Sequence, residues 1–425
     1  MSPGVVATIT DPDTYLTGVP YDELGELRRR SPVVRVDDFW AVLRHAEVRR
    51  VLRDPSTFSS YLGGTQIRDP ATDGDLAYVR QMMLNSDPPD HGRLRNLLTR
   101  AFTPRAVHLL TARIQGWADE LVASVAERGS CDFATDVAAD LPLRTLADVF
   151  GVPDQDRRLM YDWSNRVIGY QDAEYAFSAT ADRAGLTSMA RSALALRPLP
   201  NAFGELPDPR SRDGMPDLYA YAHALGEYKR THPGDDVMSI LMRHVDDVGG
   251  RVSLAEFENL FWLFSVAGNE TLRNGLPGGL YALLSHPDQY RALRSDRSLL
   301  PGAVEEMLRW WTPVMHFRRT ATVDVVLGGV QVRRGDKVVV WFTSANRDES
   351  VFADPSRFDI TRSPNDHLAF GHGPHFCLGA PLARIQMRAM FEAVLDRLGD
   401  VELAGPLVRL RSNFQNGIKH LPIRW

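Results

Sequence analysis

The chain has 425 residues, of which 44% are hydrophobic and 24% charged, so it carries enough apolar material for a large core. Its 49 basic and 54 acidic side chains give a formal net charge of -5, and no overall basicity favours a nucleic-acid-binding protein. The composition excludes a disordered or fibrous protein. We expect a globular protein that does not bind nucleic acid.

Neither a targeting segment nor a membrane anchor is predicted. The N-terminal sequence MSPGVVATITDPDTY lacks a basic stretch followed by an apolar core. The most apolar stretch, Phe261 to Ala267, is far shorter than the roughly 20 residues that cross a bilayer. The two cysteines, Cys131 and Cys377, stand far apart and without the spacing of a metal site. We therefore expect a cytoplasmic protein in a reducing compartment.

The first half of the chain changes from β-type to helical patterns. Residues 33–36 and 40–44 are β-type runs around a polar turn and predict a hairpin. The segment from 59 to 90 shows no sustained period and predicts a long irregular stretch, followed by a helix at 91–102. From about 104 to 300, apolar residues recur at intervals of three and four, which predicts helices. The proline-rich residues 197–217 interrupt them and predict a mobile surface excursion.

The late part of the chain returns to short β-type runs. Residues 323–327, 330–333 and 338–342 predict a small sheet, because turn-forming pairs separate them. A helical period over 384–398 follows, and residues 408–423 predict a further strand pair around Asn416-Gly417. The predicted fold class is therefore mainly α with small β-sheets.

Cys377 lies in a glycine-rich loop, Phe-Gly-His-Gly-Pro-His-Phe-Cys-Leu-Gly, that occupies residues 370–379 and leads into a predicted helix. Its three glycines allow positive φ and a close approach of the backbone to a flat partner. A thiolate there would be stabilised by backbone N–H groups and by the start of the helix. An activated thiolate can serve as a nucleophile or as a metal ligand. A buried free cysteine is the plainer interpretation, and it is the one we adopt for Cys131.

The same ten residues resemble the haem-binding loop of the cytochrome P-450 superfamily, F-G-x-G-x-H-x-C-x-G, at every specified position. The resemblance covers nearly the whole chain and implies the cytochrome P-450 fold as a single domain, residues 1–425. It implies haem b (iron protoporphyrin IX) bound between a long central helix and the cysteine loop with its helix. By this resemblance Cys377 is the proximal iron ligand, Phe370 and Gly371 lie beside the sulfur, and His375 lies near a haem propionate.

Residues 263–275, LFSVAGNETLRNG, carry a second part of the resemblance. Ala267, Gly268, Glu270 and Thr271 match the family element A-G-x-[DE]-T on a long predicted helix. By themselves, an acid and an alcohol in a helix suggest only surface polarity or a cap. The resemblance implies that this helix passes over the haem, and that Glu270 and Thr271 deliver protons during oxygen activation.

Two pairs of charged residues extend the match. Glu306 and Arg309, three residues apart on a predicted helix, would ordinarily form a solvated surface ion pair. They resemble the family's E-x-x-R pair, which is structural. His91 and Arg95 lie four apart at a helix start and alone are equally consistent with a basic surface patch. The resemblance assigns both, together with Arg319, to the haem propionates, since buried carboxylates must be paired.

The resemblance implies a monooxygenase that uses O2 and takes NAD(P)H electrons through a ferredoxin reductase and a ferredoxin, since no flavin or iron–sulfur domain is evident. Arginines expected around the proximal haem face would suit an acidic ferredoxin. They are Arg93, Arg100, Arg105, Arg113, Arg384 and Arg388. The segments AGNETLRNG, WFTSANRDESVFADP and NFQNGIKHLP resemble the actinobacterial branch that hydroxylates sterol side chains and branched alkyl chains.

The side chains expected around the substrate by analogy are mostly apolar, which favours a lipophilic molecule such as a terpenoid, steroid or alkyl chain. They are Leu263, Phe264, Val266, Val314, Met315 and Phe414. The excursion at 197–217 departs from the sterol-type connection. It therefore leaves open a tailoring oxidation or oxidative coupling of an aromatic or peptide-derived intermediate of secondary metabolism. A haem sensor would need an output domain, and a peroxide user commonly lacks the acid and alcohol at 270 and 271.

Overall fold

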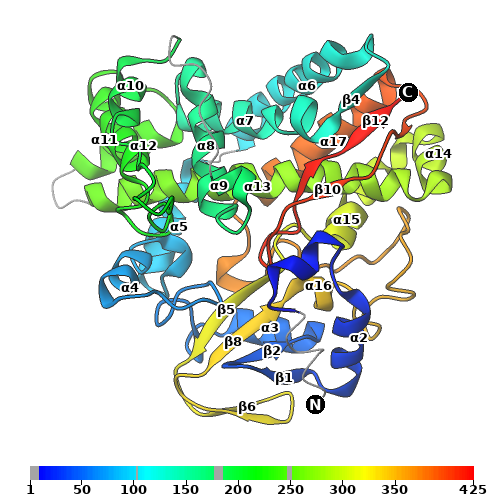
Figure 1. Cartoon of the computed structure of the whole chain (residues 1–425), viewed down its shortest axis with the longest axis horizontal. Helices are drawn as coiled ribbons and strands as arrows, with labels where there is room; N and C mark the ends of the chain where they lie inside the picture. Colours follow the sequence, from blue (N-terminus) through cyan, green and yellow to red (C-terminus); the bar gives the residue numbers. More distant parts are fainter. Residues whose placement is uncertain (1–8, 102–103, 177–184, 247–250) are drawn as a thin grey trace. The chain divides into compact units, whose positions relative to one another are not determined.

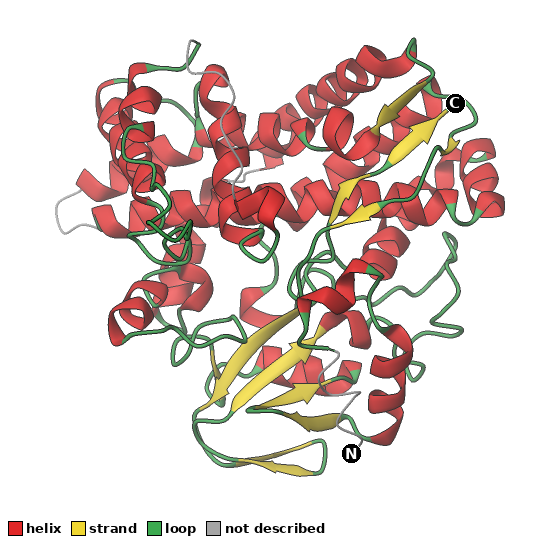
Figure 2. Cartoon of the chain, in the orientation of Figure 1, coloured by secondary structure: helices red, strands yellow, loops and turns green. Residues whose placement is uncertain are grey.

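The computed structural model describes residues 9–101, 104–176, 185–246 and 251–425 (Figure 1). Helices make up most of these residues, and the strands form small sheets (Figure 2). The predicted class, mainly α with small β-sheets, is confirmed. Within the described ranges, no helix combines the length and the apolarity needed to cross a bilayer.

Contacts between Cα atoms divide the chain into two compact units, each assembled from separate segments. The first, here called the sheet unit, comprises Met1–Ile67, Thr111–Leu141 and Thr271–Trp425. The second, here called the helical unit, comprises Arg68–Leu110 and Pro142–Glu270. That residues 1–425 form a single domain stays a prediction.

The sheet unit contains a five-stranded sheet with the order β1-β2-β8-β5-β3 (Figure 1). Its strands are β1 (Val33–Val36), β2 (Phe39–Val42), β3 (Phe58–Ser59), β5 (His316–Ala321) and β8 (Lys337–Trp341). β1 and β2 form the predicted hairpin. β8 runs parallel to β2 and antiparallel to β5, so strands from both ends of the chain share one sheet.

Two apolar layers cover this sheet, one on each face. Val338 and Val340 of β8 belong to the layer that includes residues of α3 (His45–Arg53). Val339 and Trp341 belong to the layer that includes residues of α2 (Tyr21–Arg30). Successive strand residues point to opposite faces, so β8 must be apolar at consecutive positions. This burial explains the unbroken apolar run at 338–342.

Three smaller sheets complete the strands of this unit. Two are the pairs β6 (Val325–Leu327) with β7 (Val330–Val332) and β10 (Val408–Arg409) with β11 (Ile418–His420). The third has the order β4 (Ser130–Asp132), β12 (Pro422–Arg424), β9 (Glu402–Leu403). The prediction of a single strand pair at 408–423 is therefore incomplete. β12 pairs instead with β9 and with β4, which lies far from it in sequence.

The middle of the chain is helical, as predicted. The helical unit holds α4 (Asp73–Val79), η2 (Met83–Asn85), α5 (Asp90–Ala101), η4 (Asp154–Asp156), α8 (Arg157–Ile168), α9 (Ala173–Ala176), α10 (Ser188–Leu194), α11 (Pro216–Thr231) and α12 (Val237–Asp246). Residues of both units form α6 (Pro104–Ala126), α7 (Asp140–Phe150) and α13 (Leu254–Leu284). The sheet unit adds η1 (Pro12–Leu16), η3 (Phe133–Ala138), α14 (Pro287–Ser295), η5 (Arg297–Leu299), α15 (Leu300–Trp311), α16 (Phe342–Ala345), η6 (Gly373–His375) and α17 (Ala380–Arg397).

The stretch from 59 to 90 is not irregular throughout, because it contains α4. The Thr72 hydroxyl accepts a hydrogen bond from the Asp75 N–H, and the Asp75 carboxylate accepts one from the Thr72 N–H. This reciprocal cap stabilises the start of a short helix. The three-residue spacing of Thr72 and Asp75 was the feature of the sequence that indicated this helix start. The predicted helix at 91–102 is α5, and its predicted last residue, Phe102, lies outside the described residues.

The proline-rich excursion has no regular structure from 197 to 215. Helix α11 begins at Pro216, so the last two residues of the predicted excursion, 216 and 217, are helical. Proline is favoured in the first turn of a helix, where its missing N–H costs nothing. Arg197 donates to Asp162, and the Arg210 guanidinium lies 4.5 Å from the centroid of the Tyr170 ring. These contacts join the segment to the helical unit, and its mobility stays a prediction.

Candidate functional site

The cysteine loop takes its shape from two of its three glycines. Gly371 and Gly373 have φ of +71° and +73°, a region that favours glycine. A Cβ on Gly373 would stand 2.4 Å from the carbonyl oxygen of Leu52 in α3, so this position also lacks space for a side chain. Gly379 has φ of -84° and is the N-cap of α17. The sequence allowed positive φ at all three glycines, and Gly379 does not adopt it, because the start of a helix sets an ordinary conformation there.

Cys377 is exposed and lies two residues before this N-cap. Its N–H donates to the Phe370 carbonyl at 2.9 Å, which closes the loop. A helix N-terminus favours a thiolate over a thiol. Cys131 differs, because half-burial in β4 raises the pKa of its thiol to about 12. Cys131 therefore remains protonated, and Cys377 is the thiol placed for chemistry.

His375 and Arg319 lie in the sheet unit with this loop. The Ser60 hydroxyl is 3.3 Å from His375 Nε2, which joins the cysteine loop to the segment after β3. That segment packs on β5, since the Arg318 N–H donates to the Thr65 carbonyl at 2.8 Å. Arg319 is buried in β5 and donates to the Arg318 carbonyl at 2.8 Å. Sequence analysis named Arg319 and not its buried neighbour Arg318.

These residue types fit a haem. An iron held in a porphyrin plane needs only one protein thiolate, and Cys377 offers it on an exposed loop. The half-buried ring of Phe370 supplies apolar surface next to it. The guanidinium groups of Arg318 and Arg319 are buried, and buried cations are stabilised by carboxylates such as two propionates.

Helix α13 exposes one stripe along an otherwise buried stretch. Between 260 and 280, Ala267 is exposed, and Phe264, Gly268 and Thr271 are half-buried, while every other residue is buried. These four positions are spaced three, one and three residues apart and so lie on one helical face. The stripe contains three of the four residues matched to the A-G-x-[DE]-T element. Glu270 is buried and lies off the stripe.

His91 and Arg95 lie one turn apart on α5, in the helical unit. His91 is buried and Arg95 is half-buried, so neither belongs to a fully solvated basic patch. This burial fits groups that pair with an anion. Their assignment to propionates stays a prediction.

The predicted substrate residues fall into two groups. In the sheet unit, the Met315 N–H donates to the Phe414 carbonyl at 3.0 Å, and Val314 forms a β-bridge with Gln415. The structure thus brings together Val314, Met315 and Phe414, which lie about a hundred residues apart in sequence. In the helical unit, Phe264 stacks on Phe150 with centroids 5.0 Å apart. Leu263 and Val266 are buried in the same helix.

His316, which sequence analysis did not name, contacts both segments of the first group. Its buried ring lies 4.7 Å from the Trp341 ring and 5.6 Å from the Phe414 ring, measured between centroids. Nε2–H donates to the Asn413 carbonyl at 2.9 Å. Burial lowers the pKa of His316 to about 4, so the imidazole is neutral at neutral pH.

This histidine predicts acid sensitivity. Its folded-state pKa of about 4 lies below the ordinary 6.5, so the unfolded chain binds the proton more readily between these values. The free energy of unfolding should fall as the pH falls through that window, by up to about 3 kcal/mol from this residue. Urea unfolding at pH 7 and pH 4.5 measures the loss. His316→Gln should lose less stability between the two pH values, and an equal loss in both proteins would contradict the assignment.

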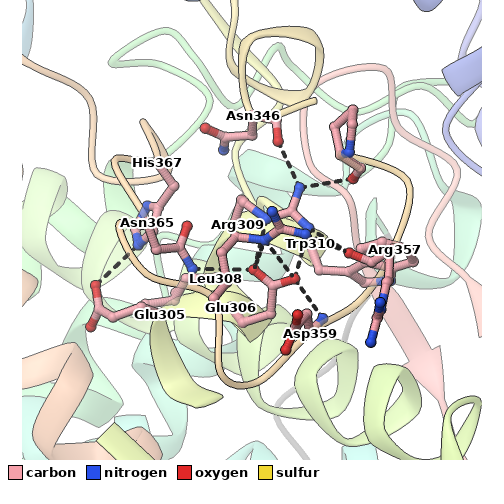
Figure 3. A network of polar contacts seen from close by, with 12 residues as sticks. Glu305, Glu306, Leu308, Arg309, Trp310, Asn346, Arg357, Asp359, Asn365 and His367 are labelled. Atoms are coloured by element: carbon pink, nitrogen blue, oxygen red, sulfur yellow. Dashed lines mark hydrogen bonds and ion pairs between the residues drawn. The ribbon is translucent and has the colours of Figure 1, made fainter. Parts of the chain in front are cut away.

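Glu306 and Arg309 form a fully buried ion pair in α15 (Figure 3). Arg309 donates from Nε and Nη2 to the two carboxylate oxygens, both at 2.7 Å. It also donates to three backbone carbonyls, those of Asn346, Pro355 and Arg357, at 2.8 to 3.2 Å. The pair is therefore not the solvated surface pair that the spacing alone suggests.

The Glu306 carboxylate accepts further hydrogen bonds from residues 359–365. Asp359 N–H donates at 2.9 Å and Asn365 Nδ2 at 3.1 Å (Figure 3). Arg362 Nε donates at 3.2 Å. Arg309 and Glu306 thus fix the long segment between β8 and the cysteine loop. Sequence analysis did not assign a role to Arg362 or Asn365, because their partner lies more than 50 residues away.

Comparison with known proteins places the chain among haem enzymes. A family model described as "Cytochrome P450" matches residues 226–399. The "Steroid C26-monooxygenase" of Rhodococcus jostii is 36% identical and the match covers 97% of this chain and 83% of the relative. The "Methyl-branched lipid omega-hydroxylase" of Mycobacterium bovis is 37% identical, over 94% of this chain and 89% of the relative.

Solved structures agree with this placement. The structure described as "Mycobacterium marinum cytochrome P450 CYP268A2 in complex with pseudoionone" has a TM-score of 0.83 and 34% sequence identity to this chain. The match covers 98% of this chain and 97% of that one. The resemblance drawn from the cysteine loop is thereby confirmed, and with it the fold.

Proposed function

We propose that this chain, which belongs to the cytochrome P450 family of haem-thiolate monooxygenases, hydroxylates a saturated carbon near the end of a branched alkyl chain, carried by a steroid or a lipid. The observation that supports this substrate class most is the pair of relatives just described. Their names specify steroid C26 and the omega position of a methyl-branched lipid. Both positions lie at the end of a branched chain.

Haem b is the cofactor of this enzyme, as in its family. It supplies the activation of O2 and the insertion of one oxygen atom into a C–H bond. We assign the axial thiolate to Cys377 and contacts with the haem face to Phe370, Gly371, Ala267 and Gly268. The groups proposed to hold the propionates are His91, Arg95, Arg319 and His375. The exposure of Cys377 and the burial of His91 and Arg319 support these roles.

The proposed substrate contacts are apolar. The stripe of α13 contributes Phe264 and Ala267, and the paired segments of the sheet unit contribute Val314, Met315 and Phe414. Leu263 and Val266 support the stripe from within α13. These side chains can bind an alkyl chain by burial of apolar surface and offer no charged group to a polar one.

Thr271 is the proposed proton-delivering group, because its hydroxyl lies on the accessible stripe. Glu270 lies buried beside it in sequence and is proposed to supply protons to Thr271 Oγ1. Thr271→Ala should lower the product formed per electron consumed by at least about tenfold, since a positioned proton donor contributes roughly 10² to 10⁴ in rate. The measurement compares NAD(P)H oxidised with product formed. Thr271→Ser, which keeps the hydroxyl, should retain coupling, and unchanged coupling in Thr271→Ala would remove the role.

Electrons are proposed to come from NAD(P)H through a ferredoxin reductase and an acidic ferredoxin, in the cytoplasm. Arg93, Arg384 and Arg388 are at least partly exposed and are proposed to face such a partner, with Arg93 and Arg384 paired to Glu256 and Glu305. The side chains of Arg100 and Arg105, predicted for the same role, lie outside the described residues. The sparing use of cysteine supports the cytoplasmic setting.

A binding and turnover series tests the substrate class. The haem-loaded enzyme is titrated with a steroid that has its branched side chain, the same steroid without the side chain, a methyl-branched fatty acid and an aromatic dipeptide. We expect a substrate-induced shift of the Soret band with the two branched-chain compounds, and mass spectrometry should find oxygen at the chain end. A shift and product with the aromatic dipeptide alone would support the alternative tailoring oxidation instead.

A further inference from the structure

Three charged or ionisable side chains form a second polar cluster next to the Glu306–Arg309 pair. Glu305 of α15 accepts hydrogen bonds from Arg384 Nε and Nη2, one on each carboxylate oxygen, both at 2.7 Å. This two-point geometry fixes the orientation of the guanidinium group. Arg384 lies in the second turn of α17, the helix that follows the cysteine loop.

His367 completes the cluster from the loop before Cys377 (Figure 3). The Ala369 N–H donates to His367 Nδ1 at 3.2 Å, so Nε2 carries a proton and donates to Glu305 at 3.1 Å. Burial opposes ionisation, yet the hydrogen bonds from Arg384 and His367 lower the pKa of Glu305 to about 2. Glu305 is therefore negatively charged at any working pH, and we call the three residues the proximal clamp.

The proximal clamp lies against the cysteine loop. The Arg384 guanidinium is 4.6 Å from the centroid of the Phe370 ring, and the His367 ring is 5.9 Å from it. Phe370 in turn accepts the hydrogen bond from the Cys377 N–H. The hydrogen bond to Glu305 raises the pKa of Arg384 most, and the charge of Cys377 raises it further. Arg384 is thus within electrostatic range of the sulfur.

We infer that the proximal clamp sets the reduction potential of the haem, by holding the Arg384 charge beside Phe370 and opposing it with Glu305. This inference rests on the proposed function, which makes Cys377 the iron ligand. Reduction adds negative charge at the iron and its thiolate, and a nearby cation stabilises that charge while a nearby anion opposes it. Glu305 and Arg384 carry opposite charges. Removal of the Glu305 charge and removal of the Arg384 charge should therefore shift the reduction potential in opposite directions.

The clamp differs from the neighbouring ion pair in where it acts. Glu306 and Arg309 are fully buried and bind backbone and side-chain groups of residues 346–365. The side chains of Glu305 and Arg384 are 27% and 33% exposed, and Arg384 contacts Phe370 of the cysteine loop itself. Solvent therefore partly screens their charges, and their effect on the free energy of unfolding should be small. The reduction potential of the haem responds to charge near the iron and is the better measure of their role.

Spectroelectrochemical titration of the haem-loaded enzyme tests the inference. Glu305→Gln removes the negative charge and should raise the midpoint potential, whereas Arg384→Gln removes the positive charge and should lower it. The double variant should lie between the two. Arg384→Lys keeps the charge without the two-point contact and should stay closer to the wild type than Arg384→Gln. The matched control is Arg388→Gln, which removes the same charge one turn further along α17 from an exposed position and should shift the potential least.

Two failures can be told apart. If the reduced wild-type enzyme with carbon monoxide lacks the far-red-shifted Soret band of a thiolate haem, the proposed ligand is wrong. If that band is present but Glu305→Gln and Arg384→Gln shift the potential in the same direction, or no more than Arg388→Gln, the inference about the proximal clamp is overturned while the ligand stands.

Discussion

Cys377→Ser should abolish monooxygenase activity and remove the far-red-shifted Soret band of the reduced carbon monoxide complex. A serine hydroxyl stays neutral at working pH, even at the start of a helix, and cannot donate charge to iron as a thiolate does. The loop itself should keep its shape, because Gly371, Gly373 and the hydrogen bond from the residue 377 N–H to Phe370 do not involve the sulfur. The loss is therefore one of electron donation, with the fold retained.

Cys131→Ser is the matched control for this experiment. Cys131 is half-buried in β4, and its raised pKa keeps it a thiol. We expect the variant to bind haem and to give the same spectrum as the wild type. A thiolate-type spectrum in Cys377→Ser, or its loss in Cys131→Ser, would contradict the assignment of the ligand.

Arg309→Ala should have the largest effect on stability, a loss of about 3–5 kcal/mol in the free energy of unfolding. The substitution leaves the Glu306 carboxylate charged and buried with fewer donors, and it frees three backbone carbonyls that Arg309 binds. The segment from Asn346 to Asn365 then loses the three attachments that Arg309 makes and keeps those to Glu306. We expect less haem-loaded protein as well, since that segment leads into the cysteine loop.

Urea unfolding and the ratio of haem to protein measure both effects. Arg309→Lys should also be impaired, because one ammonium group cannot replace a planar group that binds a carboxylate at two points and three carbonyls. Arg424→Ala is the control, since its pair with Glu402 has both side chains more than half exposed and should cost below about 0.5 kcal/mol. A loss in Arg309→Ala no larger than in Arg424→Ala would mean that the network does not support the fold.

Local patterns predicted the parts of the fold that depend on local physics. The hairpin at 33–42 follows from β-branched residues around a turn, and the cysteine loop follows from glycines whose positive φ the structure shows at 371 and 373. α4 was missed because it is short and only weakly apolar, and its start depends on the single cap at Thr72. A cap carries little weight when no apolar period accompanies it.

The candidate site needed contacts that no local pattern contains. The three-residue spacing of Glu306 and Arg309 alone predicts an exposed pair, and its burial is decided by residues 346–365 that fold over α15. In the same way, the link between His316 and Asn413 joins residues nearly a hundred positions apart. Family resemblance identified the first pair, whereas His316 and the proximal clamp became visible only in three dimensions.

The stripe on α13 bears on how the substrate specificity of such an enzyme can evolve. A Cβ on Gly268 would stand 2.7 Å from a methyl group of Leu146, so this residue keeps α13 close to α7. Ala267, its neighbour, is exposed, so its size is limited by the haem and the substrate proposed to contact it and not by the packing of helices. Side-chain volume can therefore grow at 267 without repacking the helices, whereas growth at 268 would push them apart. Selection for a new substrate can therefore act on residue 267, while Gly268 preserves the packing of α13 on α7.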